Sequence, residues 1–302
     1  MIQRLLVTGA GGFVGGSLIA QAPDWWDIHA LDCRGALAKR PRLTWHLVDL
    51  LDSDSLARLF HEICPSAVIH AAAAADIDFC ESNRDVAEKV NVGVTAQLAS
   101  LCAETKTKLV YLSTDTVFDG EKGNYVEEER PHPINYYAET KTAAEKAVRE
   151  NCENWVIARL SLVVGLPLVG SGNSFLPKML ASLEAGKQVG APGDEIRTPV
   201  DVLTLGRALI ELAVGDLKGV FHLSGNDALP RYEMAQRIAD TWGYPRELVV
   251  RKDSGSIQGR APRPRDVSLN NGKARSLLKT PMLGLEEGLE LIRAKNPEGA
   301  TS

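Results

Sequence analysis

Short apolar runs alternate with longer segments of helical spacing along the first half of the chain. The apolar runs lie at 2–8, 27–32, 43–50, 66–72, 108–114 and 155–160. Segments of helical spacing lie between them, at 12–22, 53–64, 83–105 and 136–151. Ser53 is the expected N-cap of the segment that begins there. Because apolar runs with little alternation suit strands buried on both faces, the pattern predicts an α/β fold with a doubly wound parallel sheet.

The regular alternation ends near residue 165. Beyond it the sequence predicts helices at 174–185, 200–214 and near 286–295, a loop KQVGAPGDEIRTP, and one more strand at 219–225. We therefore expect a larger domain over 1–165, to which 196–225 return. A smaller domain would be built from 166–195 and 226–302.

A glycine motif, TGAGGFVGGSL, joins the first apolar run to the first helical segment. The spacing G-x-G-x-x-G fails, because its third glycine falls on Val14. Gly9, Gly12 and Gly15 instead form G-x-x-G-x-x-G. Glycines at such a turn let the backbone approach a pyrophosphate, which the helix N-terminus then binds. This position between a strand and a helix predicts a dinucleotide-binding domain over 1–165.

Acidic residues follow the second and third apolar runs. Asp32 lies 20 residues after Gly12, where a carboxylate can bind an adenosine ribose. Arg34 could instead meet a 2′-phosphate, so the sequence leaves NAD and NADP both open. Asp49 and Leu50 close the third run and could contact the adenine edge. The sequence is equally compatible with Asp49 being an ordinary solvated loop residue.

The segment YYAETK at 136–141 carries the candidate acid–base chemistry. Tyr137 and Lys141 are four residues apart and share one helix face. An ammonium group beside a phenol favours the phenolate, so we expect Lys141 to lower the pKa of Tyr137. Thr114, at the end of the fifth run, could hydrogen-bond the same substrate oxygen. Tyr136 has Thr140 at the corresponding position, which favours Tyr137 as the catalytic phenol.

Composition and charge narrow the class of partner. The chain has 302 residues, 24% of them charged, and a net charge of −5 without a long basic run. These values argue against nucleic acid or an anionic membrane surface as the main partner. We expect no signal peptide and no membrane-spanning helix. Five scattered cysteines without metal-ligand spacing indicate reduced thiols in a cytoplasmic protein and no metal site.

These motifs together resemble the extended short-chain dehydrogenase/reductase family, and most closely its dTDP-4-dehydrorhamnose reductase branch. STDTVFDG at 113–120 resembles the branch's STDYVFDG, and HAAAAADIDFCES at 70–82 resembles its NAAAYTAVDKAES. The resemblance continues through VN at 90–91, GNSFLPKML, RTPVDVLTLGRAL, FHLSG and RPRDVSL. It implies a Rossmann domain and a smaller substrate domain for a sugar nucleotide.

The resemblance also implies residue roles. Thr114, Tyr137 and Lys141 would be catalytic. An NAD or NADP cofactor would be lined by Gly9, Gly12, Phe13, Val14, Gly15, Asp32, Arg34, Asp49, Leu50, Ala71, Ala72, Ala73, Asn91 and Lys141. The sugar nucleotide would lie near Asp115, Asn173, Arg263 and Arg265. The two arginines suit a diphosphate, and they equally suit a solvated basic loop.

The activity implied is NAD(P)H-dependent reduction of the 4-keto group of a dTDP-4-keto-6-deoxy sugar, as in dTDP-rhamnose biosynthesis. The chain departs from the branch in several places. Thr116 and Val164 each replace a tyrosine, Ala74 and Ala75 replace Tyr-Thr, and RTPVDV is two residues short. The substrate therefore stays open within this class.

Two other functions are compatible with the same motifs. The first is a sugar-nucleotide epimerase on the same fold; a dehydratase is disfavoured because Thr116 stands where such enzymes carry a glutamate base. The second is a non-enzymatic nucleotide-binding module, since the regulatory β subunit of methionine adenosyltransferase resembles this branch. The sequence is also compatible with a homodimer.

Overall fold

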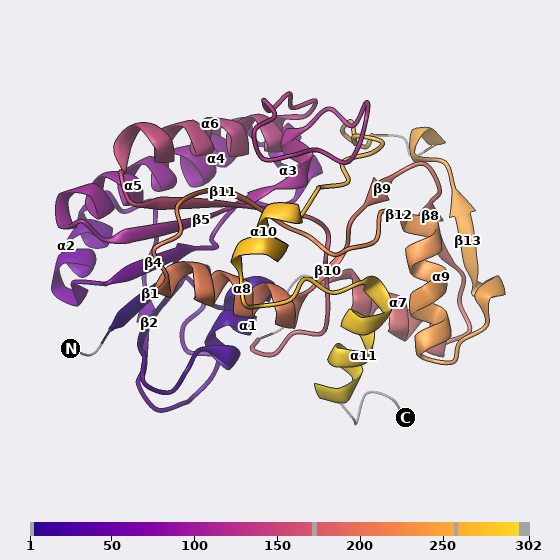
Figure 1. The fold of residues 1–302 in the computed structure, drawn as a ribbon, viewed down its shortest axis with the longest axis horizontal. Coiled ribbons are helices and arrows are strands. Elements are labelled where there is room, and N and C mark those ends of the chain that lie inside the picture. Colours follow the sequence, from indigo (N-terminus) through magenta and orange to yellow (C-terminus); the bar gives the residue numbers. More distant parts are fainter. Residues whose placement is uncertain (1–2, 171–173, 257–258, 296–302) are drawn as a thin grey trace.

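A seven-stranded sheet forms the centre of the computed structural model, which describes residues 3–170, 174–256 and 259–295. The strand order is β11-β6-β5-β4-β1-β2-β3, and every neighbouring pair is parallel (Figure 1). The strands are β1 (Arg4–Thr8), β2 (Asp27–Asp32), β3 (Leu43–Leu47), β4 (Ala67–His70), β5 (Lys108–Thr114), β6 (Trp155–Leu160) and β11 (Gly219–Leu223). The predicted doubly wound α/β fold is confirmed.

Helices cover both faces of this sheet, because alternate strand residues point to opposite sides. Leu5 and Val7 of β1 belong to one apolar core and Leu6 to the other. The first core is closed by α1 (Phe13–Gln21), α8 (Val202–Val214) and α10 (Gly272–Leu277). The second is closed by α2 (Ser53–Ile63), α5 (Val94–Thr105) and α6 (Tyr136–Asn151).

One local prediction in this half of the chain is wrong. The N-cap of α2 is Asp52, not Ser53, because the Asp52 carboxylate accepts the Ser55 N–H at 3.1 Å. The helical segment predicted at 83–105 is confirmed: it begins as α4 (Arg84–Glu88) and follows a further helix, α3 (Ile77–Ser82). A π-helical turn, η1 (Lys89–Gly93), then joins α4 to α5.

A smaller lobe packs beside the carboxyl edge of the sheet (Figure 1). Its apolar core lies between α7 (Phe175–Glu184), α9 (Arg231–Thr241) and α11 (Leu285–Lys295). Its strand pairs are β8 (Val189–Pro192) with β13 (Val249–Lys252), β9 (Ile196–Arg197) with β12 (Leu229–Pro230), and β7 (Val163–Val164) with β10 (Val200–Asp201). The loop predicted at 187–199 thus contains two strands, which are too short to show alternation and pair with distant residues. The domain boundaries stay a prediction, and α10 packs on the larger core.

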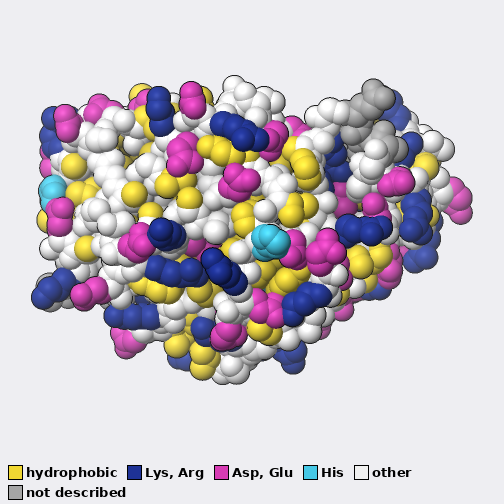
Figure 2. Space-filling model, turned by 90° about the horizontal axis from the view of Figure 1, so that it is seen from above, with side chains coloured by type: hydrophobic (Ala, Val, Ile, Leu, Met, Phe, Trp, Pro, Cys, Tyr) yellow, Lys and Arg dark blue, Asp and Glu magenta, His cyan; other side chains and the backbone are white. Residues whose placement is uncertain are grey.

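The surface carries mixed charge. On the face seen in Figure 2, Lys and Arg side chains are interspersed with Asp and Glu. Among the helices of the described residues, none is long and apolar enough to cross a membrane.

Candidate active site

The turn between β1 and α1 holds the glycine motif. Gly9 has a left-handed backbone with φ +62°, and a Cβ there would lie 2.7 Å from the backbone of Ala72. A side chain at Gly15 would overlap the carbonyl oxygen of Gly9. Gly12 donates its N–H to that same oxygen at 2.9 Å and is the N-cap of α1. Gly9, Gly12 and Gly15 therefore each make a close backbone contact, as Gly16 does with the Val169 carbonyl oxygen, so the choice of register stays a prediction.

The amino end of α1 suits an anionic group. Its first turn, which begins with the half-buried Phe13 and Val14, contains no acidic residue, and no side chain caps it. N–H groups at such a helix end attract phosphate oxygens. The residues present therefore fit the pyrophosphate of a dinucleotide.

Asp32 ends β2 directly beside this turn. Its carboxylate accepts the Gly11 N–H at 2.7 Å, the Arg34 N–H at 3.0 Å and the Arg34 Nε–H at 2.9 Å. Burial alone raises the pKa of Asp32, but these hydrogen bonds outweigh it and hold the pKa below its ordinary value. Asp32 is therefore ionised, and the half-exposed Arg34 guanidinium lies against it.

The carboxyl end of β3 lies next to that of β2, since the Val48 N–H donates to the Asp32 carbonyl at 3.3 Å. Asp49 is exposed, and its carboxylate accepts the Leu51 N–H at 3.0 Å. Leu50 is half-buried against the second core. This arrangement leaves the edge of Asp49 open to solvent, and its contact with an adenine stays a prediction.

The alanine segment after β4 completes this side of the site. The Ala71 N–H donates to the Thr8 carbonyl at 3.3 Å, and Ala71 to Ala73 follow the edge of the glycine turn. Asn91, buried in η1, accepts the Ala74 N–H at 2.8 Å and donates to the Thr140 hydroxyl at 2.9 Å. Its amide thus ties the alanine segment to α6, so Asn91 shapes the predicted cofactor site from behind.

Thr114, Tyr137 and Lys141 meet where β5 ends against the amino half of α6. Asn135 caps α6 by accepting the Ala138 N–H at 2.9 Å. The Lys141 ammonium donates to the Leu112 carbonyl at 2.6 Å and lies 4.3 Å from the ring centre of Tyr111. The end of β5 and one face of α6 therefore carry the three predicted catalytic side chains, and Tyr137 hydrogen-bonds Thr114.

The electrostatics of this group differ from the expectation. Burial raises the pKa of Tyr137 well above its ordinary value, and a hydrogen bond with Thr114 only partly opposes this shift. Burial also lowers the pKa of Lys141 to about 7. The prediction that Lys141 lowers the pKa of Tyr137 is wrong for this state, because burial dominates and the opposing effect comes from Thr114. Tyr137 is a neutral phenol and hence a proton donor.

Tyr136 faces away from this group. Its hydroxyl lies 3.3 Å from a Glu88 carboxylate oxygen, and the Arg84 guanidinium lies 4.7 Å from its ring centre. Both partners belong to the surface helix α4. The geometry therefore agrees with the choice of Tyr137 over Tyr136.

Asp115 is buried beneath the strand end. It accepts hydrogen bonds from Ser161 at 3.1 Å and Thr114 at 3.2 Å, and lies 3.9 Å from the Arg197 guanidinium. Burial raises the pKa of Asp115. It is therefore an internal partner of Thr114 and Arg197, and its direct contact with a sugar nucleotide stays a prediction.

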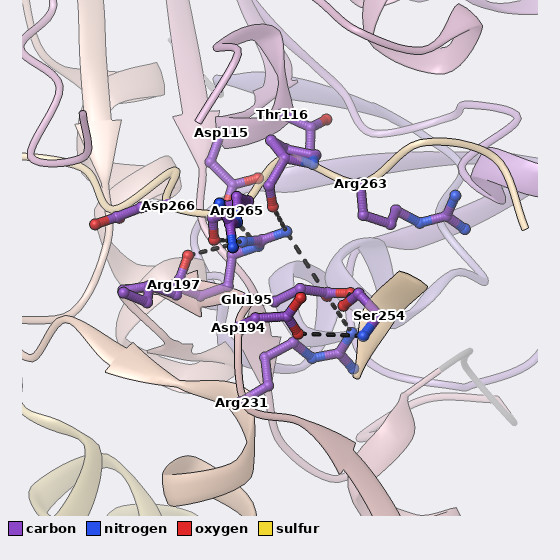
Figure 3. A network of polar contacts seen from close by, with 12 residues as sticks. Asp115, Thr116, Asp194, Glu195, Arg197, Arg231, Ser254, Arg263, Arg265 and Asp266 are labelled. Atoms are coloured by element: carbon purple, nitrogen blue, oxygen red, sulfur yellow. Dashed lines mark hydrogen bonds and ion pairs between the residues drawn. The ribbon is translucent and has the colours of Figure 1, made fainter. Parts of the chain in front are cut away.

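A cluster of arginines lies around one buried carboxylate in the smaller lobe (Figure 3). Glu195 accepts from Ser254 at 2.5 Å, from Arg260 at 2.6 Å and from Arg231 at 3.2 Å. The Arg197 guanidinium lies 3.9 Å away. Burial raises the pKa of Glu195, but its hydrogen bonds and the cations outweigh this and lower it to about 2. We call Glu195 with these three arginines the arginine cluster.

The two predicted substrate arginines extend from the same region. Arg263 pairs with Asp78 of α3 at 2.8 Å, which joins segment 260–265 to the larger domain. Arg265 is exposed. Asn173 lies outside the described residues.

Sequence reasoning missed the arginine cluster. Arg197 stands in the quoted RTPVDV segment without an assigned role, and Glu195, Arg231 and Arg260 received none. The members of the arginine cluster are up to 65 positions apart in the sequence, so no local spacing shows that they meet. The only local signal was the density of arginines in RAPRPR.

His70 adjoins the same edge but is not available as an ordinary base. Its ring nitrogens lie 2.6 Å from the Thr8 hydroxyl and 3.0 Å from the Thr95 hydroxyl. Burial lowers the pKa of His70 to about 3, so it is neutral near pH 7. Across the described residues, no cluster of His, Cys, Asp and Glu is arranged to hold a metal ion.

Comparison with known proteins agrees with this geometry. The family model described as RmlD substrate binding domain matches residues 3–295. The chain belongs to the RmlD substrate-binding domain family. A crystal structure of dTDP-4-dehydrorhamnose reductase from Bacillus anthracis in complex with NADP is similar to this RmlD-family chain, with a TM-score of 0.88 and 27% identity. The match covers 98% of this chain and 100% of that one.

Curated relatives include both an enzyme and a subunit. Methionine adenosyltransferase 2 subunit beta of Rattus norvegicus is 33% identical over 95% of this chain and 87% of its own length. The "Probable low-salt glycan biosynthesis reductase Agl14" of Haloferax volcanii is 31% identical over 82% of this chain and 84% of its own length. RmlD-family relatives therefore differ in function at similar identity.

Proposed function

We propose that this protein reduces the 4-keto group of a dTDP-4-keto-6-deoxy sugar with NADH or NADPH. The observation that carries the proposal is the Thr114–Tyr137–Lys141 group, which places a neutral phenol and a buried ammonium at the carboxyl end of β5. The similarity to a reductase crystallised with NADP supports the same chemistry. The cofactor, when bound, supplies the hydride.

The side chains then have distinct tasks. Thr114 positions the substrate carbonyl through its hydroxyl. Tyr137 donates its phenolic proton to the oxygen as negative charge develops there. Lys141 supplies a positive charge that stabilises the resulting phenolate. The high pKa of Tyr137 before reaction suits reduction, because an acid must keep its proton until the carbonyl accepts the hydride.

The decisive test compares Tyr137→Phe with Tyr136→Phe. We expect the first change to lower turnover by about 100-fold or more, since it removes the general acid. Binding of NADPH, followed by fluorescence, should stay within about twofold because Tyr137→Phe removes only one hydroxyl. The assay follows NADH and NADPH oxidation with dTDP-4-keto-6-deoxy-L-mannose and other keto-sugar nucleotides. Near-full turnover in Tyr137→Phe would contradict the assignment.

An epimerase is the rival that the same assay excludes. An epimerase returns its hydride to the substrate, so NADH or NADPH is not consumed in proportion to product. Stoichiometric oxidation supports the reductase. Dehydration is disfavoured because the Thr116 hydroxyl lies 3.0 Å from that of Thr114 and supplies no carboxylate base there.

A subunit role is the second candidate, favoured by the 33% identity to methionine adenosyltransferase 2 subunit beta. It predicts no oxidation of NADH or NADPH with any sugar nucleotide, together with stable binding to a methionine adenosyltransferase catalytic subunit. Size-exclusion chromatography of the mixture distinguishes this case and also tests for a homodimer. The five free cysteines are consistent with a reducing, cytoplasmic setting.

A further inference from the structure

A buried carboxylate lies directly behind the proposed catalytic group. Glu145 follows Lys141 by one turn of α6 and is fully buried. It accepts the Ser113 hydroxyl at 2.7 Å, and Arg159 Nε–H and Nη2–H at 2.9 Å each. Arg149 also donates to it at 3.1 Å. Strands β5 and β6 and helix α6 therefore all meet at this one side chain.

Fold stability alone does not explain why Glu145 and Arg159 form a buried ion pair. Removing two charges from water costs several kcal/mol, and apolar residues of similar volume often replace a buried ion pair without loss. Ser113, however, directly precedes Thr114, and Glu145 shares a helix face with Tyr137 and Lys141. The carboxylate thus fixes the strand end and the helix that must stay in register for the proposed proton transfer.

We propose that Glu145 is a positioning residue for the Thr114–Tyr137–Lys141 group, holding β5 against α6 and placing a compensating negative charge one turn from Lys141. This inference rests on the proposed function, because it assigns Glu145 a part in that reaction. Arg159 orients the carboxylate from behind, where it also lies 5.1 Å from the ring centre of Phe118.

The charges around Lys141 give the direction of the effect. Burial lowers the pKa of Lys141, and Glu145 is the foremost charge that opposes this. The side chains of the packed elements that contact or act on Lys141 are Glu145 of α6, Cys80 of α3, Tyr111 of β5 and His70 of β4. His70 is neutral, and the pKa of Cys80 is raised to about 11, mainly by burial. Glu145 is therefore the carboxylate in this set.

The test measures NAD(P)H oxidation across pH for Glu145→Gln, a change that keeps the shape and removes the charge. We expect kcat to fall about tenfold with KM nearly unchanged, because ground-state contacts to substrate are untouched. We also expect the loss of activity that follows deprotonation of Lys141 to occur at lower pH. The matched control is Glu150→Gln on the same helix, whose exposed carboxylate pairs with Lys146. It should leave both readouts unchanged.

A folded Glu145→Gln variant with wild-type kcat and pH profile would overturn the proposal and leave an ordinary structural ion pair. If Glu145→Gln does not fold, the double change Glu145→Gln with Arg159→Gln removes both buried charges. It should still show the lower kcat and shifted pH profile, because Glu145 and not Arg159 acts on Lys141. Wild-type behaviour in the folded double variant would equally overturn the proposal.

Ser113→Ala decides the case in which neither glutamate variant folds. It removes only the hydroxyl that links β5 to Glu145, so the protein should stay folded with a melting temperature lower by roughly 5 °C, and kcat should fall about threefold. An unchanged kcat would overturn the positioning role. Tyr137→Phe is assayed in parallel: if it retains turnover, the proposed function fails, whereas an inactive Tyr137→Phe beside an unaffected Glu145→Gln contradicts only the role of Glu145.

Discussion

The sheet edge and the smaller lobe are suited to anions by opposite means. On the sheet side, the turn at Gly9–Gly15 offers backbone N–H groups and excludes side chains. On the lobe side, the arginine cluster presents guanidinium groups that Glu195 holds together. The glycine turn depends on residues that have no side chain. The arginine cluster depends on charged side chains from distant parts of the chain.

This difference predicts how each side fails. A backbone-built site is intolerant of any added carbon, because the surrounding main chain cannot move aside. A side-chain cluster tolerates changes of shape, but removing its central carboxylate leaves several cations unpaired. Substitutions on the two sides should therefore produce different measurable losses.

Gly15→Ala should give the largest effect and would break the backbone-built side. The new Cβ would overlap the carbonyl oxygen of Gly9, to which the Gly12 N–H also donates. We expect NADPH affinity to fall by about 100-fold or more and stability to fall by about 2 kcal/mol, measured by fluorescence titration and thermal melting.

Gly93→Ala is the matched control for this change. Gly93 lies in a helical conformation with φ −59°, and a Cβ there meets nothing within 4 Å. It should bind NADPH like the wild type. Gly15→Ala with wild-type affinity would show that the close contact at the turn does not limit cofactor binding.

Glu195→Gln should give the second largest effect and tests the lobe side. It leaves the buried guanidinium of Arg197 and its neighbours without their carboxylate, so we expect a loss of about 3 kcal/mol in unfolding free energy. Glu233→Gln is the control, since Glu233 pairs with Arg237 at the surface of α9. A loss for Glu195→Gln no greater than the control's would mean that the cluster needs no central charge.

The pH dependence has a definite sign. The pKa of Glu195 falls from 4.5 to about 2 on folding, so its contribution to stability is fully present above pH 4.5. The contribution is lost as pH falls from about 4.5 towards 2, because the unfolded chain takes up the proton first. Wild type should therefore lose its advantage over Glu195→Gln across this interval in urea unfolding.

Sequence patterns predicted where the residues of the sheet side lie, because that information is local; their roles stay a prediction. The glycine spacing, Asp32 after β2 and the Tyr137–Lys141 pair all lie within one or two adjacent elements. The structure brings these predicted residues to the same strand ends. Motif spacing in a parallel sheet is enough to predict such an edge.

The arrangement of the lobe side could not be predicted from the sequence, because its contacts join residues that are far apart in the chain. Arg260 reaches Glu195 across 65 positions, and β8 and β9 are too short to show a period. The pKa of Tyr137 was also predicted in the wrong direction, because burial cannot be read from the spacing of two residues. Long-range pairing and desolvation are properties of the packed chain.

Arg34→Ala should give the smallest effect, and it sharpens the comparison because Arg34 is the exception on the backbone-built side. Its half-exposed guanidinium lies against the Asp32 carboxylate, beside the Gly11 N–H. If Arg34 meets a 2′-phosphate, the change should weaken NADPH binding about tenfold while NADH binding stays within about threefold. Arg42→Ala is the control, since Arg42 donates to the Trp25 carbonyl at the opposite end of β2. An equal loss for both cofactors would instead mean that Arg34 acts only by holding Asp32, and the sheet side would then bind phosphate through its backbone alone.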